Sequence, residues 1–247
     1  MKMNLTCVGA VGGLLVAGVA SGGGFQSLTM ELANSGNEGN TYRLFANLET
    51  GARINSVYGN GVSDLQISTA NNASIYHNAN GGPTSQSINS NFFPFVPSME
   101  WDSYVSIGSY YQNGAPFGDN DLDATGIDWS TWEGGGDLFI NDGSWFVDST
   151  DVQGAELNGQ VFLGQFTVQG GLGDASDLIG QVNLQGEDAG GNTWNAIGVT
   201  WNTDSTDNDD NGGNSNGDTN GSNAVPGIGA IAPLCFVGLV RKRRRQG

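Results

Sequence analysis

Short stretches of alternating apolar and polar residues recur along the middle of this chain, separated by stretches rich in glycine, asparagine and aspartate. The clearest lies at residues 41–48, where Tyr42, Leu44, Ala46 and Leu48 share one face. A period of two predicts a strand with one buried face. The nearly continuous apolar run at 161–168 instead predicts a central strand that is buried on both faces.

Further strands are predicted at residues 25–32, 54–58, 64–68, 73–77, 98–107, 138–140, 145–147, 179–185 and 194–201. The turn Thr50-Gly51 predicts a hairpin between strands 41–48 and 54–58. No stretch has convincing helical periodicity. About ten short strands with these turns predict an all-β fold, a single antiparallel β-sandwich over residues 23–202. The core candidates are Leu44, Trp101, Phe162, Phe166 and Val168.

The two ends differ from this body. Lys2, an apolar run over residues 8–19 and the small residues Ala20, Ser21 and Gly22 follow the order of a secretory signal, which predicts a signal peptide over residues 1–22. Residues 203–223 include no apolar residue. We therefore predict a disordered Asp/Asn/Gly-rich linker over 203–224, because such a segment cannot bury a core.

The last 23 residues combine three features in a fixed order. Val225, Pro226 and Gly227 come first, an apolar segment follows at 228–240, and the chain closes with the basic cluster Arg241, Lys242, Arg243, Arg244 and Arg245. The apolar segment can enter a bilayer, and the cationic cluster resists crossing it and stays on the cytoplasmic side. Residues 225–247 therefore form a predicted membrane-directed tail.

This order resembles the PEP-CTERM family of C-terminal sorting signals of exported bacterial proteins. In that family a short proline-containing motif precedes one apolar segment and an arginine-rich end; here Gly227 stands where the family has glutamate. The resemblance implies an exported protein sorted to the cell surface, outer envelope or extracellular matrix, with the membrane and the export and sorting machinery as partners. The aromatic stretch 91–111 is similar to one in uncharacterised exported proteins with the same class of tail, which implies no activity.

The charge distribution limits the partners of the exported part. All 25 acidic residues lie between Glu31 and Asp218, and that span contains only two bases, Arg43 and Arg53, which gives it a formal charge of −23. Phosphate contacts require clustered lysine and arginine, so nucleic acid is excluded as a partner. Both cysteines, Cys7 and Cys235, lie in the membrane-directed ends. The body can therefore form neither a disulfide nor a thiolate metal site.

Calcium is the only cofactor that the sequence suggests, at two places. In the linker, Asp207, Asp209, Asn211, Gly212 and Asp218 match positions 1, 3, 5, 6 and 12 of a calcium loop. In the body, Asp119, Asp121 and Asp123 alternate and would repel one another without a screening cation. The alternatives are a plain acidic linker and a solvated acidic loop.

Three further groups of residues suggest chemistry. Trp129 and Trp132 form either an exposed aromatic platform for sugars or a pair buried under a long loop. Glu100 and Asp102 would share a strand face about 7 Å apart, a separation that suits an acid/base pair on a glycoside. His77, the only histidine, is expected at the surface or in a capping role, because no motif around it supports a catalytic triad.

We therefore predict a non-enzymatic protein with a structural or adhesive role at the cell surface or in the extracellular matrix. The alternative is a carbohydrate-binding module that contacts extracellular polysaccharide, and a glycoside-active enzyme is the third hypothesis. Exposure of Trp129, Trp132 and Glu100 in one common groove would distinguish these hypotheses.

Overall fold

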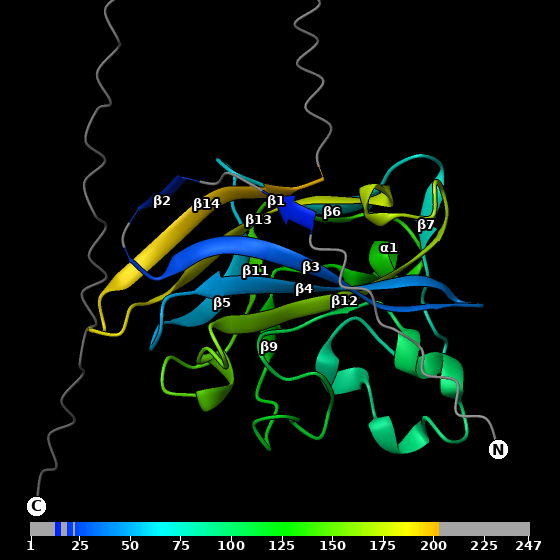
Figure 1. The fold of residues 1–247 in the computed structure, drawn as a ribbon, viewed down its shortest axis with the longest axis horizontal. Coiled ribbons are helices and arrows are strands. Elements are labelled where there is room, and N and C mark those ends of the chain that lie inside the picture. The colour runs from blue at the N-terminus through cyan, green and yellow to red at the C-terminus, as the bar shows by residue number, and fades with distance from the viewer. Residues whose placement is uncertain (1–12, 16–18, 22, 203–247) are drawn as a thin grey trace, which may run out of the picture. The chain divides into compact units, whose positions relative to one another are not determined.

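The strands of this protein form two antiparallel sheets that pack as a β-sandwich (Figure 1). The structure is a computed structural model that describes residues 13–15, 19–21 and 23–202. The predicted all-β sandwich is confirmed. The linker and the C-terminal tail lie outside the described residues, within which no helix is long and apolar enough to cross a membrane.

The first sheet has the strand order β1-β3-β4-β12-β7, and β8 also pairs with β12. Its strands are β1 (Gly13–Leu15), β3 (Phe25–Gly36), β4 (Gly39–Leu48), β7 (Ala73–Ile75), β8 (Tyr104–Val105) and β12 (Gln160–Gly170). As predicted, β12 is central and its residues 161–168 are buried on both faces.

The second sheet has the order β10-β6-β13-β5-β11-β9. β6 and β5 pair with successive parts of one edge of β13, β14 pairs with its opposite edge, and β2 pairs with β14. The strands of this sheet are β2 (Val19–Ser21), β5 (Arg53–Gly59), β6 (Leu65–Thr69), β9 (Asp123–Thr125), β10 (Leu138–Ile140), β11 (Gly143–Phe146), β13 (Leu178–Glu187) and β14 (Thr193–Trp201). The long central strand β13 holds this sheet together by pairing with β5, β6 and β14.

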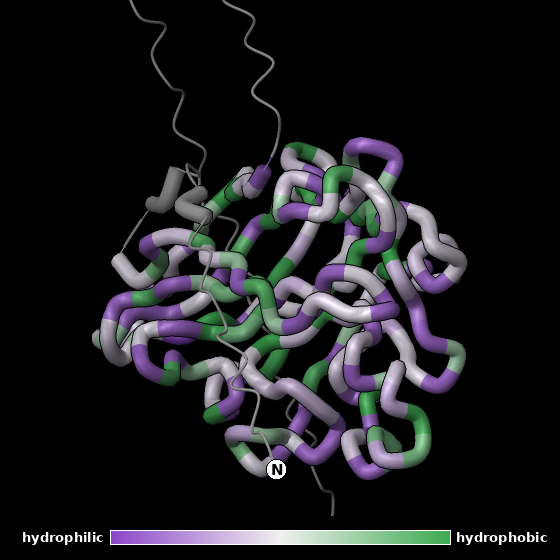
Figure 2. The backbone as a smooth tube through the Cα atoms, turned by 45° about the vertical axis from the view of Figure 1, so that its right-hand side comes forward, coloured by the Kyte–Doolittle hydropathy of each residue, from purple (hydrophilic) through white to green (hydrophobic). Residues whose placement is uncertain are grey.

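The core lies between the two sheets. Alternate residues of β4 and β12 supply Leu44 and Phe166, each 1% exposed, and the second sheet supplies Trp145, Trp194 and Trp201. In Figure 2 hydrophobic segments run through the middle of the molecule, whereas hydrophilic segments are frequent in the surrounding loops. Burial of this apolar surface is the main source of the fold's stability.

The predicted hairpin between residues 41–48 and 54–58 is wrong. The turn at Thr50-Gly51 exists, but it carries the chain from β4 in one sheet to β5 in the other. Leu48, Ala52 and Ile54 are all buried, so the turn crosses the edge of the core. Strand alternation also breaks in β5, where a bulge opposite Gln185 and Gly186 shifts the buried positions to Ile54 and Val57.

The predicted strand over 98–107 is also wrong. Residues Pro97–Trp101 form the 3-10 helix η3, and only Tyr104–Val105 is a strand. Proline fixes φ near the helical value and fits the first turn of a helix, which explains the start of η3. Trp101 is consequently only half-buried and does not belong to the core.

The connection from β7 to β9, residues 76–122, covers the outer face of the first sheet. We call it the covering segment. It contains η1 (Ser85–Ser87), η2 (Ser90–Phe92), η3 and β8, and it lies below β12 in Figure 1. A second small cluster of buried residues lies between it and the sheet, with Phe45 and Phe162 from the sheet and Ile88 and Tyr104 from the covering segment. The remaining helices are α1 (Trp129–Glu133), η4 (Val152–Gly154) and η5 (Ala175–Asp177).

Candidate functional site

The covering segment is the longest connection in the described sandwich, and it is fixed in place by polar residues of β12. Gln165 and Thr167 are fully buried on the outward face of that strand. The Gln165 side-chain amide donates to the backbone carbonyls of Glu100 and Asp102, at 2.9 and 3.0 Å. Long connections in compact domains are usually either functional or disordered. This one is held rigidly enough to present side chains in fixed positions.

Arg43, on the outward face of β4, extends this network to two tyrosines. Its Nε donates to Oε1 of Gln165 at 3.1 Å, and its Nη2 donates to the hydroxyl of Tyr111 at 3.3 Å. The guanidinium carbon lies 5.1 Å from the ring centroid of Tyr110, a cation–π geometry. One arginine therefore links the sheet to both rings and sets their orientation.

A pocket of about 190 Å³ opens beside Tyr110, and we call it the Tyr110 pocket. Its aromatic lining comes from β4, β12 and the covering segment: Phe45, Tyr110, Phe117 and Phe162. Tyr110 packs on Phe162 with 4.6 Å between ring centroids. Burial raises the pKa of Tyr110 while Arg43 acts to lower it, so its hydroxyl stays protonated at neutral pH.

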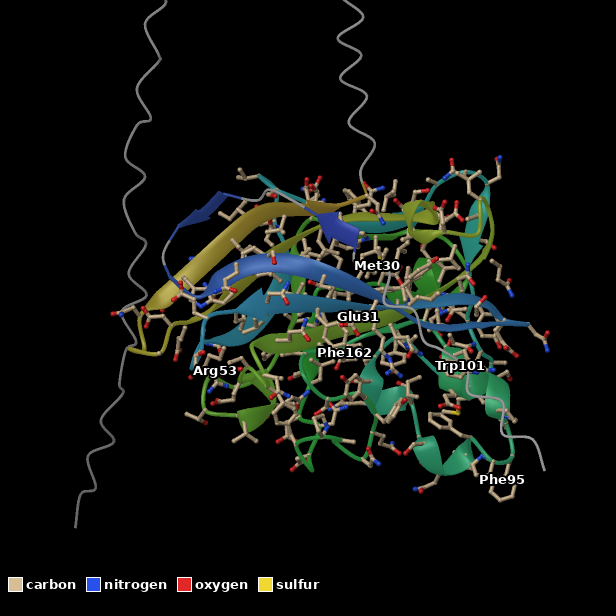
Figure 3. The ribbon with its side chains drawn as sticks, in the orientation of Figure 1. Met30, Glu31, Arg53, Phe95, Trp101 and Phe162 are labelled. Carbon is tan, nitrogen blue, oxygen red and sulfur yellow. The ribbon has the colours of Figure 1, made fainter. Side chains whose placement is uncertain are left out.

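Polar side chains complete the lining of this pocket. Glu31 comes from β3, Gln160 from the start of β12, and Asn158 from the turn before it. Figure 3 shows Glu31 and Phe162 near each other on the first sheet. An apolar aromatic wall with a few polar groups is the usual composition of a small-molecule site. The arrangement suits a ligand with one apolar face and several hydroxyl groups.

The turn that places Asn158 has a clear local cause. Asn158 and Gly159 both have positive φ, 57° and 80°, as a type I′ turn requires. The backbone of Leu157 and Gln160 closes the turn with reciprocal hydrogen bonds of 2.9 and 3.3 Å. The Asn-Gly pair therefore holds Leu157, which is 47% exposed, at the pocket.

A second notable group is a buried cluster around His77. Its side chain is 8% exposed, with Nδ1 3.6 Å from Glu133 and 3.9 Å from Asp102, and its ring packs edge-on against Trp132 at 4.8 Å. Neither ring nitrogen has a hydrogen-bond partner among the described residues. Burial lowers the pKa of His77 to about 4, with the Ser103 backbone acting in the opposite direction. The expectation of a surface histidine is wrong, because Trp132 and Asp102 enclose the ring.

Asp102 anchors the covering segment. Its Oδ1 accepts from the backbone N–H groups of Asn78 and Ser103 at 2.7 and 2.9 Å, and its Oδ2 accepts from that of Gly82 at 3.1 Å. Burial raises the pKa of Asp102 to about 7 against these three donors, and Glu133 adds to the increase. The predicted strand-face pair with Glu100 does not exist, because both residues belong to η3 and its cap and Asp102 is enclosed.

The two tryptophans proposed as a platform lie on the short helix α1, where Asp128 caps the first turn by accepting from Ser130 N–H. Trp132 is fully buried and Trp129 packs partly against the core. They form no exposed platform, since the helix directs Trp132 onto Phe166 and His77. Trp129, Trp132 and Glu100 therefore do not meet in one exposed groove.

The aspartates at 119, 121 and 123 are exposed on the chain leading into β9. Asp119 and Asp123 each accept a hydrogen bond from the next backbone N–H group. Across the described ranges, no three acidic, histidine or cysteine side chains are grouped closely enough to hold a metal ion. The structure therefore does not bring Asp119, Asp121 and Asp123 together as a ligand set.

The remaining predicted site residues lie outside the described residues. They are the linker residues Asp207, Asp209, Asn211 and Asp218 and the tail residues Val225, Pro226, Gly227, Arg241, Lys242, Arg243, Arg244 and Arg245. Their roles stay predictions.

Comparisons with protein-family models, curated proteins and solved structures gave no match to this chain. The function of this chain is therefore inferred from the geometry of the site and from the predicted leader and tail.

No sequence motif marks Arg43, Tyr110 or Gln165 as site residues. One signal for Gln165 and Thr167 was present: two polar residues interrupt a strand that is otherwise apolar, and buried polar groups require hydrogen-bond partners. A layer over that face of the sheet was thus implied. Arg43, one of only two bases in the body, was the second signal.

Proposed function

We propose that this chain is an exported cell-surface or matrix protein with a structural or adhesive role, and that it contacts neutral extracellular polysaccharide through the Tyr110 pocket. The observation that carries the proposal is the pocket itself, with four aromatic side chains and the polar side chains of Glu31, Asn158 and Gln160 on a rigid sheet. In this proposal the adhesive role is carried out by carbohydrate binding, so the first hypothesis and its alternative are combined.

A sugar ring matches this pocket in its chemistry. Its C–H face can pack on the ring of Tyr110 or Phe117, and its hydroxyls can donate to Glu31 and exchange hydrogen bonds with the side-chain amides. The charge of the exported part, −23, repels polyanions. Neutral glycans are therefore the favoured ligand class, ahead of sulfated or uronic-acid polymers.

The export part of the proposal rests on the predicted leader and tail. We expect peptides from the body in surface or matrix material, and none from beyond residue 226, when that material is analysed by mass spectrometry. Intact tail peptides in a soluble extracellular fraction would contradict sorting by the tail.

The binding part is tested with the exported protein in native gels that contain a soluble neutral glucan or galactomannan. Binding slows migration relative to a gel without polysaccharide, and the protein's negative charge provides the mobility. Unchanged mobility in every neutral polymer would refute the glycan proposal while leaving localisation as a separate result.

A non-catalytic role also stays part of the proposal. Asp102 is engaged by three backbone N–H groups, so it is not available as the partner of Glu100 in glycoside hydrolysis. Release of reducing ends from a bound polysaccharide, lost on Glu100→Gln, would contradict this assignment.

Calcium binding by the linker is proposed separately. If Asp207, Asp209, Asn211 and Asp218 bind the ion, isothermal titration of the exported protein should show calcium binding that the Asp207→Asn, Asp209→Asn double variant loses. Equal heats for both proteins would leave the linker as a plain acidic spacer.

A further inference from the structure

The segment that includes β1 and β2 occupies the outer edges of both sheets. β1 pairs with β3, with Gly13 opposite Met30 and Leu15 opposite Leu28. β2 pairs with β14, with Val19 opposite Ile197 and Ser21 opposite Asn195. Figure 1 shows β1 and β2 on the same side of the molecule, beside β3 and β14. Both edges therefore accept an additional antiparallel strand.

Export would remove the strands that fill these edges. β1 and β2 both lie within the predicted signal peptide, residues 1–22, so the inference rests on the export part of the proposed function. Cleavage leaves the backbone groups on the outer edge of β14, around residues 195–197, without their strand partner. An open edge of this kind is a template for pairing with another chain.

The edge of β14 has few of the features that normally prevent such pairing. Its nine residues, TWNAIGVTW, include no charged residue and no proline. Ile197 is 48% exposed on this strand. In its pairing with β13, β14 has a bulge at Ile197 and Gly198, whereas residues 193–196 pair with β13 in regular register. By contrast, β3 includes the exposed Glu31, and β9 at the far edge of the second sheet begins with Asp123.

We infer that, in the exported protein, the outer edge of β14 pairs antiparallel with the β14 edge of a second copy. An identical antiparallel pair has two-fold symmetry, so one uncharged strand is complementary to itself. The strongly acidic bodies repel each other elsewhere, whereas β14 adds no charge at the contact. The result is a sheet that continues from one molecule to the next, as a structural surface protein needs.

The experiment compares two forms of the protein: the exported form, collected from the host surface, and an unexported form that retains its leader. N-terminal sequencing reports leader removal, and sedimentation velocity reports the oligomeric state. We expect dimers for the exported form and monomers for the form in which β2 still fills the edge. Because the bodies repel, raising the salt concentration should strengthen the dimer.

The discriminating variant is Ile197→Lys, which puts like charges near each other across the two-fold axis. It should weaken the dimer by roughly two- to fivefold, because opposed like charges destabilise strand pairs. The matched control is Phe139→Lys on the edge strand β10, where Phe139 is 56% exposed and the dimer should persist. Circular dichroism spectra of the two variants that match that of the wild type show that folding is intact.

Three results would overturn the inference. A surface protein with its leader removed that stays monomeric at all salt concentrations refutes pairing alone and leaves the proposed function standing. A dimer that survives Ile197→Lys and is lost with Phe139→Lys places the contact elsewhere. An uncleaved leader on the surface protein removes the open edge and refutes both the inference and the leader prediction, while polysaccharide binding remains an independent readout.

Discussion

The carboxylate of Asp102 lies 3.9 Å from Nδ1 of His77, and both side chains, which belong to the covering segment, are almost completely buried. Burial shifts the two pKa values in opposite directions, upward for Asp102 to about 7 and downward for His77 to about 4. A neutral pair and an ion pair hold the same number of protons. The pair therefore takes up no net proton over the range in which free aspartate and histidine would titrate.

The sign of each contribution to stability follows from proton linkage. Unfolded His77 binds a proton below about pH 6.5 and folded His77 only below about pH 4, so its contribution to stability rises with pH across that range. Folded Asp102 keeps its proton up to about pH 7, so its contribution is complete below pH 3.8 and is lost as pH rises through 7. In the wild-type protein the two slopes largely cancel between pH 4 and 6.5.

Replacing either His77 or Asp102 should reveal the pH dependence of stability that the remaining residue contributes. His77→Gln keeps only the falling contribution, so its melting temperature should decline relative to wild type as pH rises from 4 to 6.5. Asp102→Asn keeps only the rising contribution and should show the opposite trend, below a generally lowered stability. Calorimetric melts at half-unit pH steps measure both, and parallel curves for all three proteins would contradict the linkage.

Gly81 approaches Asp102 too closely for any side chain. A Cβ at this position would lie 1.7 Å from Oδ2 of Asp102. Gly81→Ala should therefore cost about 1–3 kcal/mol or more, because overpacking forces the buried carboxylate from its hydrogen bonds. Gly61→Ala is the matched control, since its Cβ would meet nothing within 4 Å. Equal denaturation midpoints for the two variants would refute this account of Gly81.

Phe166 tests the apolar core. It is 1% exposed on β12, and Phe166→Ala should destabilise the protein by about 3–5 kcal/mol. The free energy of unfolding of a domain is usually roughly 5–15 kcal/mol, so chemical denaturation will resolve a loss of this size. Phe95, 81% exposed on the covering segment and set outward in Figure 3, serves as the control, and Phe95→Ala should change stability by less than about 0.5 kcal/mol.

Much of this core could be predicted from the alternation in β4 and the continuous apolar run of β12. The partners of β4 could not, because strand alternation shows which face is buried but not which strand lies beside it. The turn at Thr50-Gly51 fits a hairpin and a crossing between sheets equally well. Strand pairing decides for the crossing, because β4 pairs with β3 and β12 whereas β5 pairs with β11 and β13. Pairing is a property of the folded chain.

The candidate site was less predictable for a related reason. Residues 98–105 alternate like a strand, yet Pro97 starts a 3-10 helix there, and this turns Asp102 inward toward His77. Tyr110 meets Phe162 across a long separation in sequence, and no local pattern encodes that contact. The site is formed by long-range packing of the covering segment on β12.

Arg43 should control the order of the covering segment. Arg43→Lys keeps the charge but cannot reach Gln165 and Tyr111 together, and the loss should be about 1–3 kcal/mol. Hydrogen exchange should accelerate in residues 98–117 and stay unchanged in β13 and β14. Arg53→Lys, at the other arginine of the body, is the control and should leave exchange in residues 98–117 unaltered; acceleration by both variants alike would contradict a specific role for Arg43.

The most direct test of the central claim is the polysaccharide affinity of the exported protein with and without the aromatic wall of the Tyr110 pocket. In native gels containing a neutral glucan or galactomannan, we expect Tyr110→Ala to weaken binding by about tenfold or more, because it removes the ring on which a sugar face packs. Phe139→Ala, which removes an exposed aromatic ring on β10, should bind like wild type. The predicted result is that the polysaccharide slows the migration of wild type and of Phe139→Ala, and no longer slows that of a folded Tyr110→Ala protein. Equal affinities of Tyr110→Ala and Phe139→Ala would contradict the assignment of this pocket as the glycan site.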